Sequence, residues 1–156
     1  MKSFPWKCGK CRERAVNPAT LPNYSADLDH DGRKYHVVLV DFDVARCEKC
    51  GAIVLDDVAN GRLNDALRTE AGLLRPSEIR ADREALGLTQ KMLAGYLRIA
   101  EATLSRWETG AQIQQRSMDA FLRTFFEVPE ARRFLLADES EPAGSRMTAA
   151  HARARH

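Results

Sequence analysis

Four cysteines, arranged as two C-x-x-C pairs, are the feature that most limits what this chain can fold into. The pairs are Cys8/Cys11 and Cys47/Cys50, and the sequence has no other cysteine. Two intervening residues let the chain turn so that both thiolates of a pair face one point, and four thiolates form the tetrahedral set of closed structural zinc sites. We therefore expect one structural Zn²⁺ per chain, bound by all four cysteines.

The same cysteines could instead bind iron, perform redox chemistry or hold a catalytic metal. Iron remains an alternative because the spacing of the cysteines does not separate it from zinc. A redox dithiol is less favoured, since such a site needs one pair within a βαβ frame. Four thiolates leave no open coordination position for catalysis. The sequence also shows no nucleophile with a partner base, and we expect no enzymatic activity.

The 35 residues between the two pairs must form a folded excursion that returns to the metal. Residues 34–44 alternate in hydropathy and predict a strand. One face of this strand is expected to hold Val38, Val40, Phe42 and Val44. The acidic run at 27–32 resembles the start of a calcium loop, but position 12 of such a loop would be a valine instead of the required glutamate. We interpret it as a polar turn.

The length of 156 residues suits two small domains, and we expect an α+β protein. The expected parts are a zinc-bound, β-containing domain over 1–55, a linker helix over 56–71, an all-helical domain over 72–137 and a disordered tail over 138–156. No apolar run is long enough to span a membrane, and the charged first residues do not form a signal peptide. We expect a cytoplasmic protein.

The second half has the pattern of a compact helical bundle. Helices are predicted at 76–86, 90–97, 100–109, 115–128 and 129–136. Thr89 is suited to capping the second of these helices, and glycines follow the first and third. Met92, Leu93 and Leu97 are expected to face inward. Two short helices joined by a tight turn at Arg98 are typical of a helix-turn-helix, whose second helix enters the major groove of DNA.

The stretch LGLTQKMLAGYLRIAEATLSRWETG, residues 86–110, resembles the XRE/Cro-type helix-turn-helix. Two C-x-x-C pairs ahead of such a domain resemble the YgiT-type zinc-finger/helix-turn-helix family, which includes the MqsA-type antitoxins. This resemblance covers residues 4–136. It implies a sequence-specific, DNA-binding transcriptional regulator: the antitoxin of a type II toxin-antitoxin system, which neutralises an mRNA interferase toxin and represses its own operon.

The resemblance also implies how DNA is bound. A homodimer would bind a palindromic operator in double-stranded DNA, with half-sites about 34–36 Å apart, and part of the aromatic face of 115–128 would form the dimer contact. The implied contact residues are Gln90, Arg98, Glu101, Ala102, Thr103, Ser105, Arg106 and Arg116. Arg106 is the strongest candidate for reading a base, because a guanidinium matches O6 and N7 of guanine. Similar domains join the positions of Arg83 and Glu108 by an ion pair.

Other functions share these motifs. A stand-alone zinc-finger/helix-turn-helix repressor would have the same sequence features without a toxin partner. A protein-interaction adaptor would not bind duplex DNA, and a zinc or redox enzyme would show thiol chemistry or an open metal site. The net charge of +2, with its excess within 71–137, permits nucleic-acid binding without requiring it.

Overall fold

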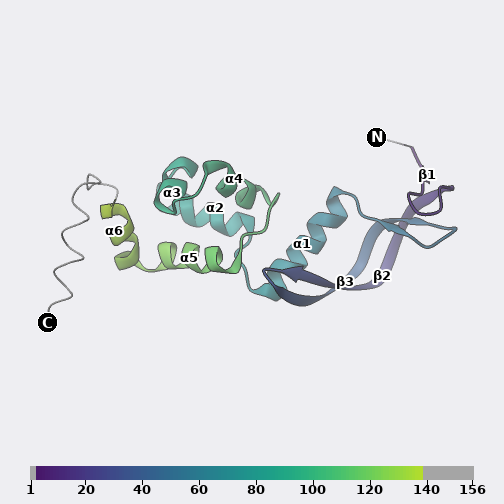
Figure 1. Ribbon diagram of the computed structural model, residues 1–156, viewed down its shortest axis with the longest axis horizontal. Coiled ribbons are helices and arrows are strands. Elements are labelled where there is room, and N and C mark those ends of the chain that lie inside the picture. The colour runs from purple at the N-terminus through teal and green to yellow at the C-terminus, as the bar shows by residue number, and fades with distance from the viewer. Residues whose placement is uncertain (1–2, 139–156) are drawn as a thin grey trace. The chain divides into compact units, whose positions relative to one another are not determined.

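The computed structural model describes residues 3–138, and the chain divides into two compact units, Met1–Arg75 and Pro76–His156. The first unit contains a four-stranded antiparallel sheet and one helix, and the second contains five helices within the described residues (Figure 1). This arrangement confirms the expected α+β fold. The tail expected over 138–156 lies, apart from its first residue, outside the described residues.

The sheet has the order β1-β2-β3-β4, with neighbouring strands antiparallel. Its strands are β1 (Trp6–Lys7), β2 (Arg14–His30), β3 (Arg33–Cys47) and β4 (Ile53–Val54). A two-residue turn joins β2 to β3, with φ angles of 51° at Asp31 and 74° at Gly32. Positive φ at both residues is the backbone form that matches the twist of a hairpin. The polar turn expected from the acidic run is thus confined to these two residues.

The expectation that Val38 and Val40 share the buried face of β3 is wrong. Their exposed fractions are 58% and 60%, whereas Val37 and Phe42 are fully buried. The burial pattern shifts by one residue at Asp41, where φ is 47°. Strict alternation assumes an unbroken strand, so one left-handed residue moves the following side chains to the opposite face.

The helix α1 (Asp57–Ala71) packs against β3. Asp56 caps its first turn by accepting a hydrogen bond from the backbone N–H of Ala59 at 2.8 Å. At the break in β3, the two terminal nitrogens of Arg62 donate to the carbonyls of Asp41 and Val40 at 2.7 and 2.9 Å. The segment expected to link two domains therefore contributes a helix to the first unit.

The helices of the second unit lie close to their predicted positions. They are α2 (Pro76–Ala85), α3 (Gln90–Tyr96), α4 (Glu101–Thr109), α5 (Arg116–Glu127) and α6 (Pro129–Asp138). Thr89 caps α3 as predicted, with its hydroxyl accepting from the N–H of Met92 at 3.1 Å. Met92 itself is 43% exposed, so its predicted inward position is wrong, while Leu93 and Leu97 are buried. No helix within residues 3–138 combines the length and apolar character of a membrane span.

Candidate metal centre and nucleic-acid interface

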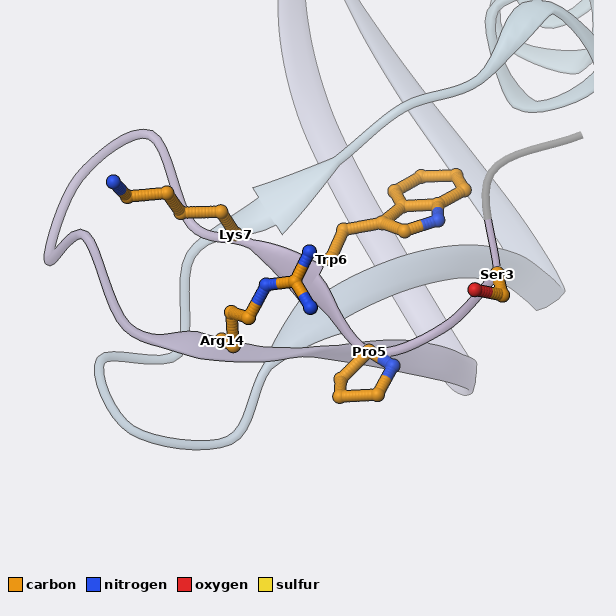
Figure 2. Close-up of a pocket in the computed structure, with 5 residues that line it drawn as sticks. All are labelled: Ser3, Pro5, Trp6, Lys7 and Arg14. Carbon is orange, nitrogen blue, oxygen red and sulfur yellow. The ribbon is translucent and has the colours of Figure 1, made fainter.

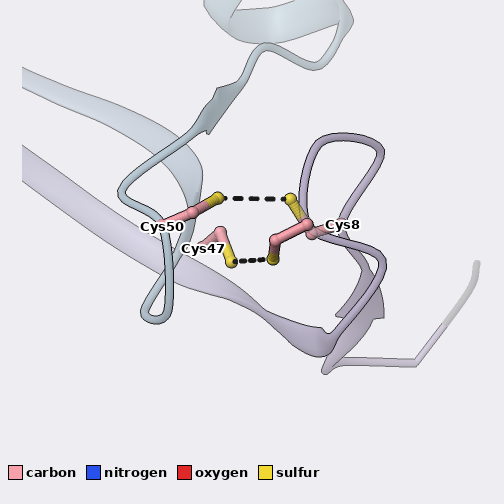
Figure 3. Close-up of side chains that lie close together, drawn as sticks. Cys8, Cys47 and Cys50 are labelled. Atoms are coloured by element: carbon pink, nitrogen blue, oxygen red, sulfur yellow. Dashed lines mark hydrogen bonds between the residues drawn. The ribbon is translucent and has the colours of Figure 1, made fainter.

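The four cysteine thiols lie together at one end of the sheet. Their sulfur atoms all lie within 4.8 Å of one another. The Sγ atoms of Cys8 and Cys50 are 3.6 Å apart, as are those of Cys11 and Cys47 (Figure 3). Sulfurs bound tetrahedrally at about 2.3 Å from Zn²⁺ would be about 3.8 Å apart. The spacing and the donor set both suit a tetrahedral metal ion such as Zn²⁺.

Two turns of equal geometry present these thiols. In each turn, the N–H of the fourth residue after the first cysteine bonds that cysteine's carbonyl: Arg12 to Cys8 at 3.0 Å, and Gly51 to Cys47 at 2.8 Å. The N–H of Cys8 also donates to the carbonyl of Glu13, and the N–H of Cys47 donates to the carbonyl of Ala52, each at 2.8 Å. The two C-x-x-C pairs therefore fold as equivalent knuckles that approach the metal position from two sides.

Backbone polarity favours thiolates at this site, whereas burial opposes them. Cys8 and Cys47 are buried, and Cys11 and Cys50 are half-buried. Backbone hydrogen bonding, first from Cys11, lowers the pKa of Cys8 to about 6. A backbone hydrogen bond from Glu13 lowers the pKa of Cys11, but burial and the three neighbouring thiols raise it to about 12. Closely spaced thiols oppose one another's ionisation, and a divalent cation relieves that opposition.

In the second unit, α3 and α4 form the expected pair of short helices. The turn between them contains Arg98, whose φ of 56° is in the left-handed region. Ala100 precedes α4 without a side-chain cap, and Gly110 ends the helix with φ of 80°. The turn at Arg98 and the glycine at position 110 therefore fix where α4 begins and ends, and α4 lies beside α3.

A buried ion pair fixes α4 against α2. Glu108 on α4 accepts from Nε of Arg83 at 2.7 Å and from its Nη2 at 3.0 Å. Burial by itself raises the pKa of Glu108, but hydrogen bonds from Arg83 and Gln90 outweigh it and lower the pKa. The ion pair implied by the resemblance is present, and its two parallel hydrogen bonds restrict rotation of α4.

Gln90 joins this network. Its side-chain amide donates to Oε2 of Glu108 at 2.8 Å, which connects the start of α3 to the end of α4. Arg80 lies 3.7 Å from the same carboxylate oxygen and is largely exposed. The resemblance implies that Gln90 bonds a phosphate and steadies the recognition helix. Its bond to Glu108 shows how Gln90 holds α4 in place.

The other predicted contact residues occupy several environments. Glu101, Ala102 and Arg106 are exposed on α4, while Thr103 and Ser105 are half-buried beside them. Leu104 and Trp107 are buried on the opposite side, as expected of core residues. Arg98 is exposed before α4, and Arg116 is half-buried in the first turn of α5. The structure thus leaves the predicted base-reading positions of α4 accessible to a partner.

Comparison with known proteins agrees with this geometry in the second unit. The family model of helix-turn-helix domains matches residues 79–131, about a third of the chain. The match begins within α2 and ends within α6, so it includes α3 and α4 completely. No curated protein matches the chain. The second unit carries a helix-turn-helix domain of the XRE type, the class found in DNA-binding transcriptional regulators.

Proposed function

We propose that this protein is a sequence-specific repressor that serves as the antitoxin of a type II toxin-antitoxin system in the cytoplasm. In this proposal the helix-turn-helix unit binds an operator in its own promoter, and the first unit binds and neutralises an mRNA interferase. The four thiolates hold one structural Zn²⁺, which folds the first unit around the two knuckles. The chain has no catalytic role.

The observation that carries the DNA-binding part is the surface of α4. Arg106 projects from the exposed side of a short helix whose opposite side is anchored by the Arg83–Glu108 pair. Anchoring fixes the helix from which Arg106 projects, and a guanidinium can pair with O6 and N7 of guanine through two hydrogen bonds. The neighbouring methyl group of Ala102 is suited to contact with a thymine methyl group.

The aromatic face of 115–128 does not supply the expected dimer contact, because Phe125 is buried and Phe126 is half-buried. The exposed apolar residues of α6, with Val128 just before it, support instead a homodimer on a palindromic operator. Phe134 is 73% exposed, and Val128 and Leu136 are also exposed. A two-fold contact through these residues would bury apolar surface that one chain leaves in water. It would also give two copies of α4, one for each half-site.

The surface of the sheet supports a protein partner for the first unit. Val38 and Val40 project from the uncovered face of β3, away from the face that contains Val37. Adjacent exposed valines on a strand are suited to contact with another protein. This surface favours the antitoxin over a repressor that acts alone.

Co-purification and growth rescue test the antitoxin proposal. We expect the chain to bind the product of the neighbouring gene and to restore growth when that product is toxic. The double variant Val38→Lys/Val40→Lys should lose rescue while it retains DNA binding, and Val58→Lys, at an exposed valine on α1, is the control. A toxic neighbour that the wild-type chain neither binds nor silences would contradict the antitoxin role, and absence of sequence-specific binding to the upstream DNA would contradict repression.

A further inference from the structure

A cavity of about 200 Å³ lies where β1, β2 and β3 meet the start of α1. Its lining includes the apolar residues Phe4, Trp6, Pro18 and Val58 and the acidic residues Asp43 and Asp56. None of the described residues that line it is a lysine, an arginine or a histidine. Cavities for drug-sized ligands span about 300–1,000 Å³, so this smaller one suits a single long side chain.

Two stacked aromatic rings form one wall of this cavity. The centroids of the Phe4 and Trp6 rings are 4.3 Å apart, and the angle between the rings is 16°. Phe4 is 41% exposed, so its ring is accessible to a partner. The negative face of an aromatic ring attracts an ammonium or guanidinium group that lies within about 6 Å of the ring centroid. The wall therefore favours an organic cation.

Trp6 also lines a neighbouring cavity of different charge (Figure 2). The charged residues of that cavity are Lys7 and Arg14. The indole of Trp6 and the side chain of Lys7 point away from each other, as successive side chains of a strand do. The cationic and the acidic side chains therefore line different cavities, and the smaller, acidic one suits a cation.

Uncharged donors hold the two carboxylates of the smaller cavity. The hydroxyl of Thr20 donates to Oδ1 of Asp43 at 2.6 Å, and the backbone N–H of Ala59 donates to Oδ1 of Asp56 at 2.8 Å. Over residues 3–138, neither carboxylate forms an ion pair with a lysine, arginine or histidine. These donors fix the carboxylates and leave their negative charges in place.

The lining fits an alkylammonium or guanidinium group better than a metal ion or an anion. A divalent cation needs more oxygen ligands than two carboxylates beside apolar walls supply. The same carboxylates would repel an anion. Lysine and arginine side chains combine an apolar stem with a charged head. The stem can contact the rings of Phe4 and Trp6 while the head meets the carboxylates.

The cavity lies close to the surface that we assign to the partner protein. Asp43 and Val40 are both exposed, and they lie three residues apart on β3. A protein that covers Val38 and Val40 would therefore come within reach of Asp43. The proposed partner is an mRNA interferase, and proteins that bind nucleic-acid phosphates do so largely through lysines and arginines. Such a partner carries side chains of the kind that the cavity fits.

We propose that this cavity binds one lysine or arginine side chain of the partner protein that covers Val38 and Val40. This inference rests on the antitoxin part of the proposed function. The stacked rings contact the apolar stem of that side chain, and Asp43 and Asp56 bind its charged head. The valines would supply apolar contact, and the cavity would supply specificity for a cationic partner.

The test compares two full-length double variants. Asp43→Asn/Asp56→Asn removes both charges, while asparagine keeps an oxygen for Thr20 and is also a good helix cap. Asp29→Asn/Glu70→Gln removes the same charge at two exposed residues that are not among the described residues lining the cavity. Isothermal titration calorimetry measures the affinity for the product of the neighbouring gene. We expect the cavity variant to bind at least about tenfold more weakly, and the control to match the wild type.

Val58 is 72% exposed, so the rescue control Val58→Lys adds a cation at the exposed side of this cavity. The added ammonium group stays in water and competes weakly for the carboxylates, as the members of exposed ion pairs do. We expect the affinity to fall by no more than about fivefold, which is compatible with growth rescue.

A double-mutant cycle identifies the cation of the partner. Each exposed lysine and arginine of the partner is replaced by alanine in turn and titrated against the wild type and the cavity variant. One replacement should weaken binding to the wild type about tenfold and leave binding to the cavity variant nearly unchanged. Phe4→Leu, which removes one ring, should weaken binding several-fold. Metal content and far-ultraviolet circular dichroism establish that the variants are folded.

Equal affinity of the wild type and the folded cavity variant would overturn the inference while the antitoxin role stands. Weaker binding of the cavity variant without a coupled lysine or arginine on the partner would also overturn it. If the wild type does not bind the product of the neighbouring gene, the antitoxin part of the proposed function fails first, and the inference fails with it.

Discussion

Arg12 and Gly51 occupy the same position in two equivalent turns, and both have left-handed backbones, with φ of 68° and 72°. Each residue follows the first cysteine of its pair by four positions, and each donates its N–H to that cysteine's carbonyl. Glycine adopts this conformation without steric cost, whereas arginine does not. The first knuckle therefore contains backbone strain that the second avoids.

Replacing Arg12 by glycine should stabilise the first unit. Relief of left-handed strain outweighs the entropy that glycine loses on folding, and we expect a gain of about 0.5–1 kcal/mol. Chemical denaturation of the zinc-loaded protein measures the change. Gly51→Ala is the matched control and should be destabilising. The cost would be conformational, because the nearest atom to an added Cβ is an arginine nitrogen at 3.7 Å. A loss of stability in Arg12→Gly would contradict the argument.

Replacing Arg98 by glycine should increase stability and weaken DNA binding at the same time. Its φ of 56° in the α3–α4 turn is strained for arginine. We expect Arg98→Gly to raise the Tm by a few degrees and to weaken duplex binding several-fold, because the proposed phosphate contact would be lost. Calorimetry and mobility shifts measure the two effects. Arg98→Ala keeps the strain, so it should weaken binding without the gain in Tm.

The buried pair of Arg83 and Glu108 should make the second unit sensitive to acid. Since the pKa of Glu108 is lowered on folding, its contribution is complete above the unfolded pKa of about 4.3 and is lost as pH falls through the lower folded value. The free energy of unfolding should change more between neutral and acidic pH in the wild type than in Glu108→Gln. That variant should lose about 3 kcal/mol at neutral pH, because Arg83 keeps an uncompensated buried charge.

Removing one thiolate should unfold only the first unit. Cys47→Ser leaves three ligands, and we expect the sheet within 1–55 to unfold while the helices of 76–138 persist. Two-dimensional NMR spectra would show which residues lose dispersion, and metal analysis of the wild type should give one Zn²⁺ per chain. A separate fragment, residues 72–137, should remain helical and bind DNA. Unfolding of that fragment would show that the two units depend on each other.

Arg106 and Arg116 should affect DNA binding in different ways. Arg106→Ala would remove the proposed contact to a base edge, so it should cost about 1–3 kcal/mol on the operator and relax sequence preference. Arg116→Ala would remove the proposed phosphate contact, so it should weaken binding to all duplexes alike. Footprinting of the upstream DNA distinguishes the two. An unchanged footprint for Arg106→Ala would mean that α4 is not the recognition helix.

The helical unit could be predicted closely because its signals are local. Thr89 at the start of α3, Gly110 after α4 and apolar residues at helical spacing fix helix bounds within a few residues. The cysteine site could also be predicted, since C-x-x-C spacing largely determines where the thiols point. These features need no knowledge of the rest of the chain.

The long hairpin was harder to predict because it depends on pairing at a distance. β2 contains Pro18 and Pro22, which reduce its resemblance to a strand, and only pairing with β3 explains its length. The Asp31-Gly32 dipeptide was an available signal for the turn. The shift at Asp41 had no signal in the alternation of residues, so the wrong face was assigned to Val38 and Val40.

The two knuckles come from opposite ends of the sheet's sequence, with the whole hairpin between them. A single metal ion bound by both knuckles would act as a reversible cross-link, closing a long loop much as a disulfide does. Under metal starvation this cross-link would open, and proteases would gain access to the first unit before the second. The lifetime of the cysteine-bearing unit in a cell would then follow the supply of the metal, independently of the unit that carries the helix-turn-helix domain.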